Sequence, residues 1–144
     1  MELKNMSSNT RVESILKIIL IMIFAVALAT GLNLLLRGVA GIPEFQGQIN
    51  PSVDNELRFL SIFWIAFGFF CLSISKSVDG NRKYIPYIAL IFFVSGIGRL
   101  ISWLSVGEPI TLFIGVMVLE LTLPILILGL FLKTKANGAL SVQT

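Results

Sequence analysis

A chain of 144 residues, 56% of them hydrophobic and 13% charged, has the size of one domain and is far too apolar for a soluble one. Its net charge of +3 does not indicate nucleic-acid binding, because the basic residues neither cluster on one polar face nor alternate with stacking aromatic residues. Histidine is absent and Cys71 is the single cysteine, which excludes an internal disulfide, a histidine or thiolate metal site and a Ser-His-Asp or Cys-His nucleophile. We therefore expect no metal and no cofactor.

Four apolar runs follow one another along the chain, and most of the charges lie between them. Each run is close to the about 20 residues that a helix needs to cross the hydrocarbon core of a bilayer. We interpret the first run as an uncleaved helix, because its apolar character continues past a signal-peptide-like "ALA" at 27–29. The predicted helices cover about residues 15–37, 57–75, 84–104 and 110–132, with a polar segment, 1–14, before them and a polar tail, 133–144, after them.

The connections between the runs differ in length. The first, 38–55, carries four glycines or prolines in its first ten residues and has room for a small cap or a half-embedded segment. Its last residues, "SVDNE" at 52–56, offer candidate N-caps for the second helix. The connections "KSVDGNRK" at 76–83 and "SVGEPI" at 105–110 are short, which favours antiparallel neighbouring helices. We predict an all-α integral membrane protein, an antiparallel four-helix bundle.

The distribution of lysine and arginine predicts the orientation of this bundle. Eight of the eleven basic residues lie before the first helix or in its first turn, between the second and third helices, or in the C-terminal tail. The positive-inside rule therefore predicts that both termini and the central connection are cytoplasmic. The connections 38–55 and 105–109 are then expected to face outward.

Two ionisable residues lie inside the third and fourth apolar runs, where the bilayer disfavours them. Arg99 comes four residues before Trp103, which places it roughly 6 Å below the outer interface. Glu120 follows Pro109 by 11 residues and lies near the midplane. An arginine at the centre of a spanning helix costs about 2.5–3.5 kcal/mol, so both residues need partners. We predict that Glu120 meets Arg99, with Arg58 close by, around a small outward-facing polar pocket.

Spacings of three and four residues place the other polar groups on shared helix faces, which we expect to point inward. These faces are Val26, Thr30, Asn33 and Arg37; Arg58, Ser61, Ile65 and Gly68; Ser95, Arg99 and Ser102; and Glu120 with Pro124. Pro124 frees a backbone carbonyl of its own helix and is a candidate hinge, or simply a static kink.

The polar cluster admits more than one interpretation. Three arginines against one deep glutamate favour an anionic ligand, small or lipid-like, although the outer acids Glu44, Asp54, Glu56 and Glu108 offset part of that excess. Alternatively, the Arg99–Glu120 pair is a packing latch in a structural or accessory subunit, or Arg99 simply snorkels to water. An enzyme that uses Glu120 as acid or base on a membrane-soluble substrate is disfavoured by the poor inventory of nucleophiles and metal ligands. A homo-oligomer or a partner membrane protein stays open, and lipid contact is expected throughout.

Several short motifs occur in order: "NELRF" at 55–59, "GIGRLIS" at 96–102, "GEP" at 107–109 and "LELTLPILIL" at 119–128. With them the chain resembles the bacterial membrane family known as domain of unknown function 4345, over about residues 15–132. The resemblance implies a small four-helix protein of the bacterial inner membrane without an established activity. The family pattern maps onto Asn55, Glu56, Arg58, Gly98, Arg99, Ser102, Pro109, Glu120 and Pro124. The full candidate cluster, for a ligand or for a buried polar latch, is Asn33, Arg37, Asn55, Glu56, Arg58, Ser95, Arg99, Ser102 and Glu120, with Pro124 as the hinge.

Overall fold

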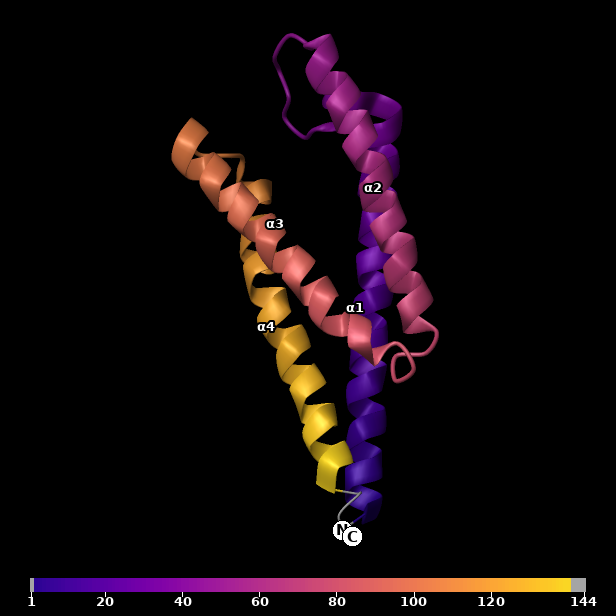
Figure 1. Ribbon diagram of the computed structural model, residues 1–144. Helices are drawn as coiled ribbons and strands as arrows, with labels where there is room; N and C mark the ends of the chain where they lie inside the picture. Colours follow the sequence, from indigo (N-terminus) through magenta and orange to yellow (C-terminus); the bar gives the residue numbers. More distant parts are fainter. Residues whose placement is uncertain (1, 141–144) are drawn as a thin grey trace. The chain divides into compact units, whose positions relative to one another are not determined.

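The computed structural model of the chain describes residues 2–140, and this range contains four long α-helices and no strand (Figure 1). The elements are α1 (Glu2–Arg37), the 3-10 turn η1 (Gly38–Gly41), α2 (Pro51–Ser75), the 3-10 turn η2 (Arg82–Tyr84), α3 (Ile85–Val106) and α4 (Thr111–Leu140). The predicted all-α class is therefore confirmed.

All four helices are long and apolar enough to cross a membrane. The apolar spans are Thr10–Gly41, Pro51–Ser75, Arg82–Val106 and Thr111–Lys133. Each span has at least the about 20 residues that cross the hydrocarbon core, and the first three are longer than the predicted runs. The chain thus has the four helices of a multi-pass membrane protein.

The first and last helices continue beyond these apolar spans. α1 begins at Glu2 and α4 ends at Leu140, so the polar segments predicted at both ends are largely extensions of helices. No proline interrupts either extension, and many of their residues are good helix formers. Part of the predicted tail, 141–144, lies outside the described residues.

α2 begins earlier than the sequence predicts, at Pro51 instead of about residue 57. Its N-cap is Asn50, whose side-chain oxygen accepts hydrogen bonds from the backbone N–H of Ser52 at 2.9 Å and of Val53 at 3.4 Å. Pro51 occupies the first helical turn, where its missing N–H costs nothing. The candidate caps in "SVDNE" therefore lie inside the helix, and Asp54 belongs to its first turn.

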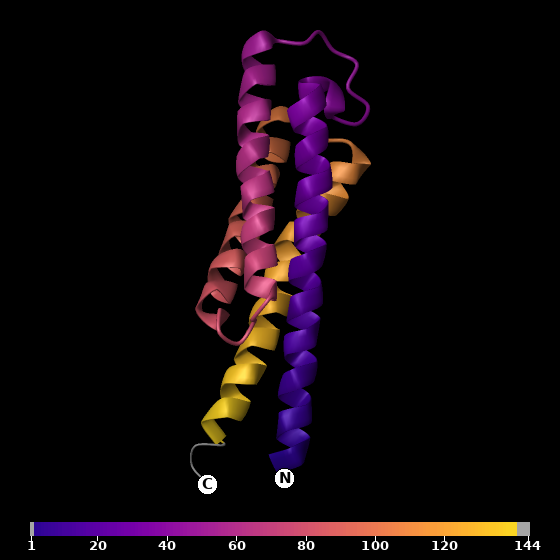
Figure 2. The ribbon, with the colours of Figure 1, turned by 90° about the vertical axis from the view of Figure 1, so that its right-hand side faces the viewer.

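Residues 17–77 form one compact unit, in which the main part of α1 and α2 are antiparallel and side by side (Figures 1 and 2). Small residues bring the two helices close together: a Cβ added at Gly68 would lie 2.9 Å from the Cβ of Ala27. The rings of Phe24 and Phe69 meet nearby, 5.2 Å apart between centroids. Close approach of this kind is how helices associate in lipid, where burial of apolar surface gives little driving force.

The buried face of α1 differs from the predicted one. Leu20, Ile23 and Ala27 are buried, whereas Val26 is 55% exposed and Thr30 is exposed as well. Thr30 does not need burial among polar partners, because its hydroxyl donates to the carbonyl of Val26 on the same helix at 2.7 Å. The same hydroxyl accepts the indole N–H of Trp64 at 2.9 Å.

The second compact unit contains α3 and α4, joined by the short connection 107–110. Contacts between the two helices pair early residues of α3 with late residues of α4, so the helices are antiparallel: Arg82, just before α3, reaches Phe131, and Gly96 lies against Leu121. A Cβ added at Gly96 would lie 2.8 Å from the Leu121 side chain, which shows how closely the helices approach there. The assembly of both hairpins into one bundle and the cytoplasmic placement of the termini stay predictions.

Candidate functional site

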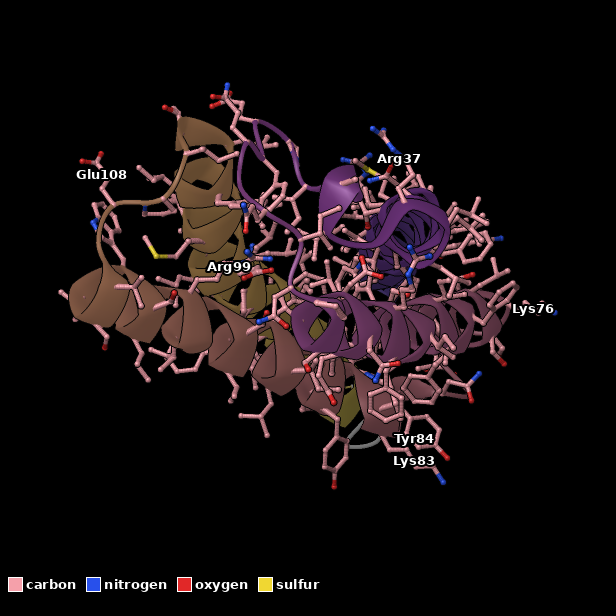
Figure 3. The ribbon with its side chains drawn as sticks, turned by 90° about the horizontal axis from the view of Figure 1, so that it is seen from above. Arg37, Lys76, Lys83, Tyr84, Arg99 and Glu108 are labelled. Carbon is pink, nitrogen blue, oxygen red and sulfur yellow. The ribbon has the colours of Figure 1, made fainter. Side chains whose placement is uncertain are left out.

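An ion pair joins α3 to α4 inside the second hairpin. The Nε of Arg99 donates a hydrogen bond to Oε2 of Glu120, with 2.7 Å between the two atoms. The Glu120 side chain is 5% exposed, whereas that of Arg99 is 38% exposed. In Figure 3, Arg99 lies next to the α4 ribbon, while Glu108 points away from it. The two residues that the depth estimate selects are thus in direct contact.

The directions of the two helices explain how residues at different depths meet. Long helical side chains lean toward the N-terminus of their own helix. Because α3 and α4 are antiparallel, Arg99 leans away from the connecting loop and Glu120 leans toward it. Gly96, one turn from Arg99, brings the helix backbones close enough for a single direct hydrogen bond.

The pair leaves several hydrogen-bonding atoms unused. Among the side chains and backbone of residues 10–133, neither Nη nitrogen of Arg99 has a hydrogen-bond acceptor, and Oε1 of Glu120 has no donor. Oε1 belongs to a side chain that is only 5% exposed, so the carboxylate is almost completely removed from solvent. The guanidinium carbon lies 5.6 Å from the centre of the Phe113 ring. The pair therefore combines a half-buried guanidinium with unused Nη nitrogens and an almost completely buried carboxylate, next to an aromatic ring.

Pro124 lies within α4, one turn beyond Glu120, and is buried. Because proline has no N–H, the backbone carbonyl of Glu120 loses its usual hydrogen-bond donor. The glutamate that carries the pair is therefore also the residue at which α4 is weakened. A role of Pro124 as a hinge stays a prediction.

Arg58, the predicted neighbour of this pair, has a different set of partners in the first hairpin. Its Nε donates to Oδ2 of Asp54 at 2.7 Å, and its Nη1 donates to the carbonyls of Leu35 at 2.6 Å and Leu36 at 3.1 Å. Asp54 in turn accepts the backbone N–H of Val39 at 2.8 Å. Arg58 and Asp54 thus satisfy backbone groups where α1 ends and η1 begins. The predicted proximity of Arg58 to Glu120 concerns the other unit and stays a prediction.

The remaining candidates in the first hairpin gather near the same corner without forming one site. The side-chain amide of Asn33 donates to the carbonyl of Gly41 at 2.7 Å and so fixes the end of η1. Arg37, the last residue of α1, is exposed. Asn55 and Glu56 are exposed on α2.

Two further candidates share α3 with Arg99. Ser95 and Ser102 are both exposed, and neither contributes to the pair with Glu120. Sequence reasoning missed the roles of Asp54 and Phe113. For Asp54 a signal exists, because Asn50-Pro51 is a strong helix start and puts Asp54 four residues before Arg58 on the same helix. Phe113 has no comparable signal among the many apolar residues of α4.

Comparison with known proteins adds the family of the chain and little else. A scan of protein families matches residues 15–131 to a Domain of unknown function (DUF4345). Neither curated proteins nor solved structures give a match. The matched range includes all four apolar spans almost completely, together with Arg58, Arg99 and Glu120. By this match the chain belongs to the DUF4345 family.

Proposed function

We propose that this multi-pass membrane protein binds the anionic group of a small or lipid-like molecule through Arg99. The proposal is supported by a difference in exposure between the two partners of the ion pair. Glu120 is almost completely buried, whereas the side chain of Arg99 is 38% exposed. Neither Nη nitrogen of Arg99 donates a hydrogen bond to the described residues. In an apolar environment, unused guanidinium donors are strongly attracted to phosphate or carboxylate oxygens, which they bind in a planar, two-pronged geometry.

Glu120 has a supporting role in this proposal. Its carboxylate holds the Nε of Arg99, which restricts the orientation of the guanidinium and leaves both Nη nitrogens without a hydrogen bond to the described residues. Phe113 on α4 contacts the same guanidinium and limits its movement further. The charge distribution of the loops indicates that the pair lies in the outer half of the membrane, so the ligand is expected from the extracytoplasmic side or from the outer leaflet.

The test compares two arginines of the same hairpin. The purified protein in nanodiscs that contain a mixture of phospholipids, all of which carry an anionic phosphate group, is compared with the variants Arg99→Gln and Arg82→Gln, and retained lipid is counted by native mass spectrometry. Arg82 is the matched control, because it also pairs with an acid and lies over a phenylalanine ring at 5.6 Å. We expect Arg99→Gln to weaken lipid retention about tenfold, the effect of losing one charged hydrogen bond. Equal retention by both variants would contradict the proposal.

A latch is the second candidate, and one observation favours it. The buried carboxylate of Glu120 lies next to the close approach of α3 and α4 at Gly96 and Leu121, where an ion pair can fix helix register. If the pair is only a latch, Arg99→Gln lowers thermal stability while added anionic lipid does not stabilise the wild type. If Arg99 binds a ligand, lipid raises the melting temperature of the wild type and not that of Arg99→Gln.

A further inference from the structure

The ion pair has no net charge, which restricts the ligands that it can hold. A bare anion is attracted by Arg99 but repelled by the carboxylate of Glu120, which lies within 2.7 Å of the same guanidinium. In a medium of low dielectric constant this repulsion is strong. A ligand that carries a positive group beside its negative one avoids the repulsion and uses both partners.

The unused atoms of the pair match such a ligand. Arg99 offers two Nη nitrogens that donate, and Glu120 offers Oε1, which accepts no hydrogen bond from the described residues and is almost completely buried. The Nη donors and the Oε1 acceptor belong to two side chains that are hydrogen-bonded to each other, so they lie close together. An oxyanion and an ammonium separated by a short linker can therefore bind both groups at once.

The position of the pair favours a lipid headgroup over a deeply buried ligand. The guanidinium contacts Phe113, which comes two residues after the first residue of α4, roughly 3 Å along the helix axis. The guanidinium thus lies toward the loop end of the hairpin, which is the end nearest to the phospholipid headgroups when α3 and α4 span the bilayer. Large apolar side chains of α3 and α4 are exposed, among them Ile101 (58%), Leu112 (56%) and Leu119 (54%), and suit contact with acyl chains.

We propose that the site recognises a phosphoethanolamine group, with the phosphate on the Nη nitrogens of Arg99 and the ammonium on Oε1 of Glu120. This inference rests on the proposed function and specifies the ligand that Arg99 binds. A choline group is a poorer ligand, because its three methyl groups remove the N–H donors that Oε1 would accept. A glycerol headgroup lacks the positive charge and leaves the carboxylate unopposed.

The experiment uses the full-length protein in nanodiscs that contain equal amounts of phosphatidylethanolamine, phosphatidylglycerol and phosphatidylcholine. Native mass spectrometry identifies the lipids that remain bound. We expect the ethanolamine lipid to exceed each of the others about tenfold, and N-methylated ethanolamine lipids to decline with each methyl group. Water-soluble phosphoethanolamine is added as a competitor, since displacement of lipid by it would assign recognition to the headgroup alone and absence of displacement would assign it to the intact lipid.

Glu120→Gln gives the sharpest comparison. The amide keeps an oxygen acceptor for Arg99 but removes the negative charge, so the preference should shift from ethanolamine to phosphatidylglycerol. Equal binding of the three lipids by the wild type would overturn the inference, and this measurement does not depend on any variant folding. If that binding still requires Arg99, the proposed function survives. If it is also indifferent to Arg99→Gln, both fail.

Discussion

Both hairpins contain an arginine–carboxylate pair with a separation of 2.7 Å, yet the two pairs are built differently. In the first hairpin Asp54 and Arg58 are four residues apart on α2, with side chains 21% and 40% exposed. In the second, Glu120 and Arg99 come from different helices, and the carboxylate is 5% exposed. The two pairs therefore have equal N–O distances but differ in how far the carboxylate is removed from water and in how many residues separate the partners.

The pairs also differ in how many hydrogen bonds they complete. Asp54 and Arg58 form hydrogen bonds with backbone groups of residues 35–39, so most of their polar atoms stabilise the turn between α1 and η1. Arg99 and Glu120 complete one hydrogen bond and leave three polar atoms unused by the described residues. A structural role at the end of α1 therefore explains the first pair fully. The second pair has unused hydrogen-bonding atoms that are available to a ligand. Experiments should therefore test this difference between the two pairs.

The largest effect is expected from Arg99→Leu, which leaves the buried carboxylate of Glu120 without its cation. Removing one partner of a buried ion pair costs about 3 kcal/mol of unfolding free energy. The double variant Arg99→Leu/Glu120→Leu should recover most of that loss, because apolar residues replace buried ion pairs well. Unfolding in mixed micelles, followed by circular dichroism, gives the coupling energy of the double-mutant cycle. Additive single effects would mean that the pair is not coupled.

A smaller loss is expected when the corner of the first hairpin is disturbed at Gly38. This residue has φ +56°, and an added Cβ would overlap the carboxylate of Asp54. Gly38→Ala should therefore destabilise by about 2 kcal/mol, from left-handed backbone strain and displacement of Asp54. Gly98→Ala is the matched control, because a Cβ there meets no atom within 4 Å. Equal melting temperatures for the two variants would argue against the corner described above.

Asp54→Asn isolates the charge of the first pair with little change in shape. The amide oxygen can still accept the N–H of Val39, while the attraction to Arg58 weakens. We expect a loss of about 1 kcal/mol in unfolding free energy and no change in lipid retention. A loss of lipid from Asp54→Asn equal to that from Arg99→Gln would show that the two pairs do not differ in function.

The sequence predicts the four helices and the Arg99–Glu120 contact because both follow from the cost of polar groups in hydrocarbon. An apolar run of about 20 residues has few alternatives to a spanning helix, and a charge inside it must find a partner. Asp54 looks like a loop residue in the sequence because α2 starts at Pro51, before the apolar run becomes continuous. The predicted inward face of α1 differs from the buried one because Thr30 satisfies its hydroxyl locally. How the two hairpins pack has no comparable local signal, since apolar residues cover all sides of these helices.

The smallest effect is expected at the other arginine pair of the second hairpin. Arg82 lies 3.9 Å from Asp79, whose side chain is 73% exposed, so water competes with the arginine for that carboxylate. Such pairs contribute at most about 0.5 kcal/mol, and salt screens them. Arg82→Gln should thus change the melting temperature little, and less again at high ionic strength. Arg99→Gln should keep its larger effect in salt, because its carboxylate partner is shielded from the solvent. If salt reduced both effects equally, burial of Glu120 would no longer explain why the two pairs differ.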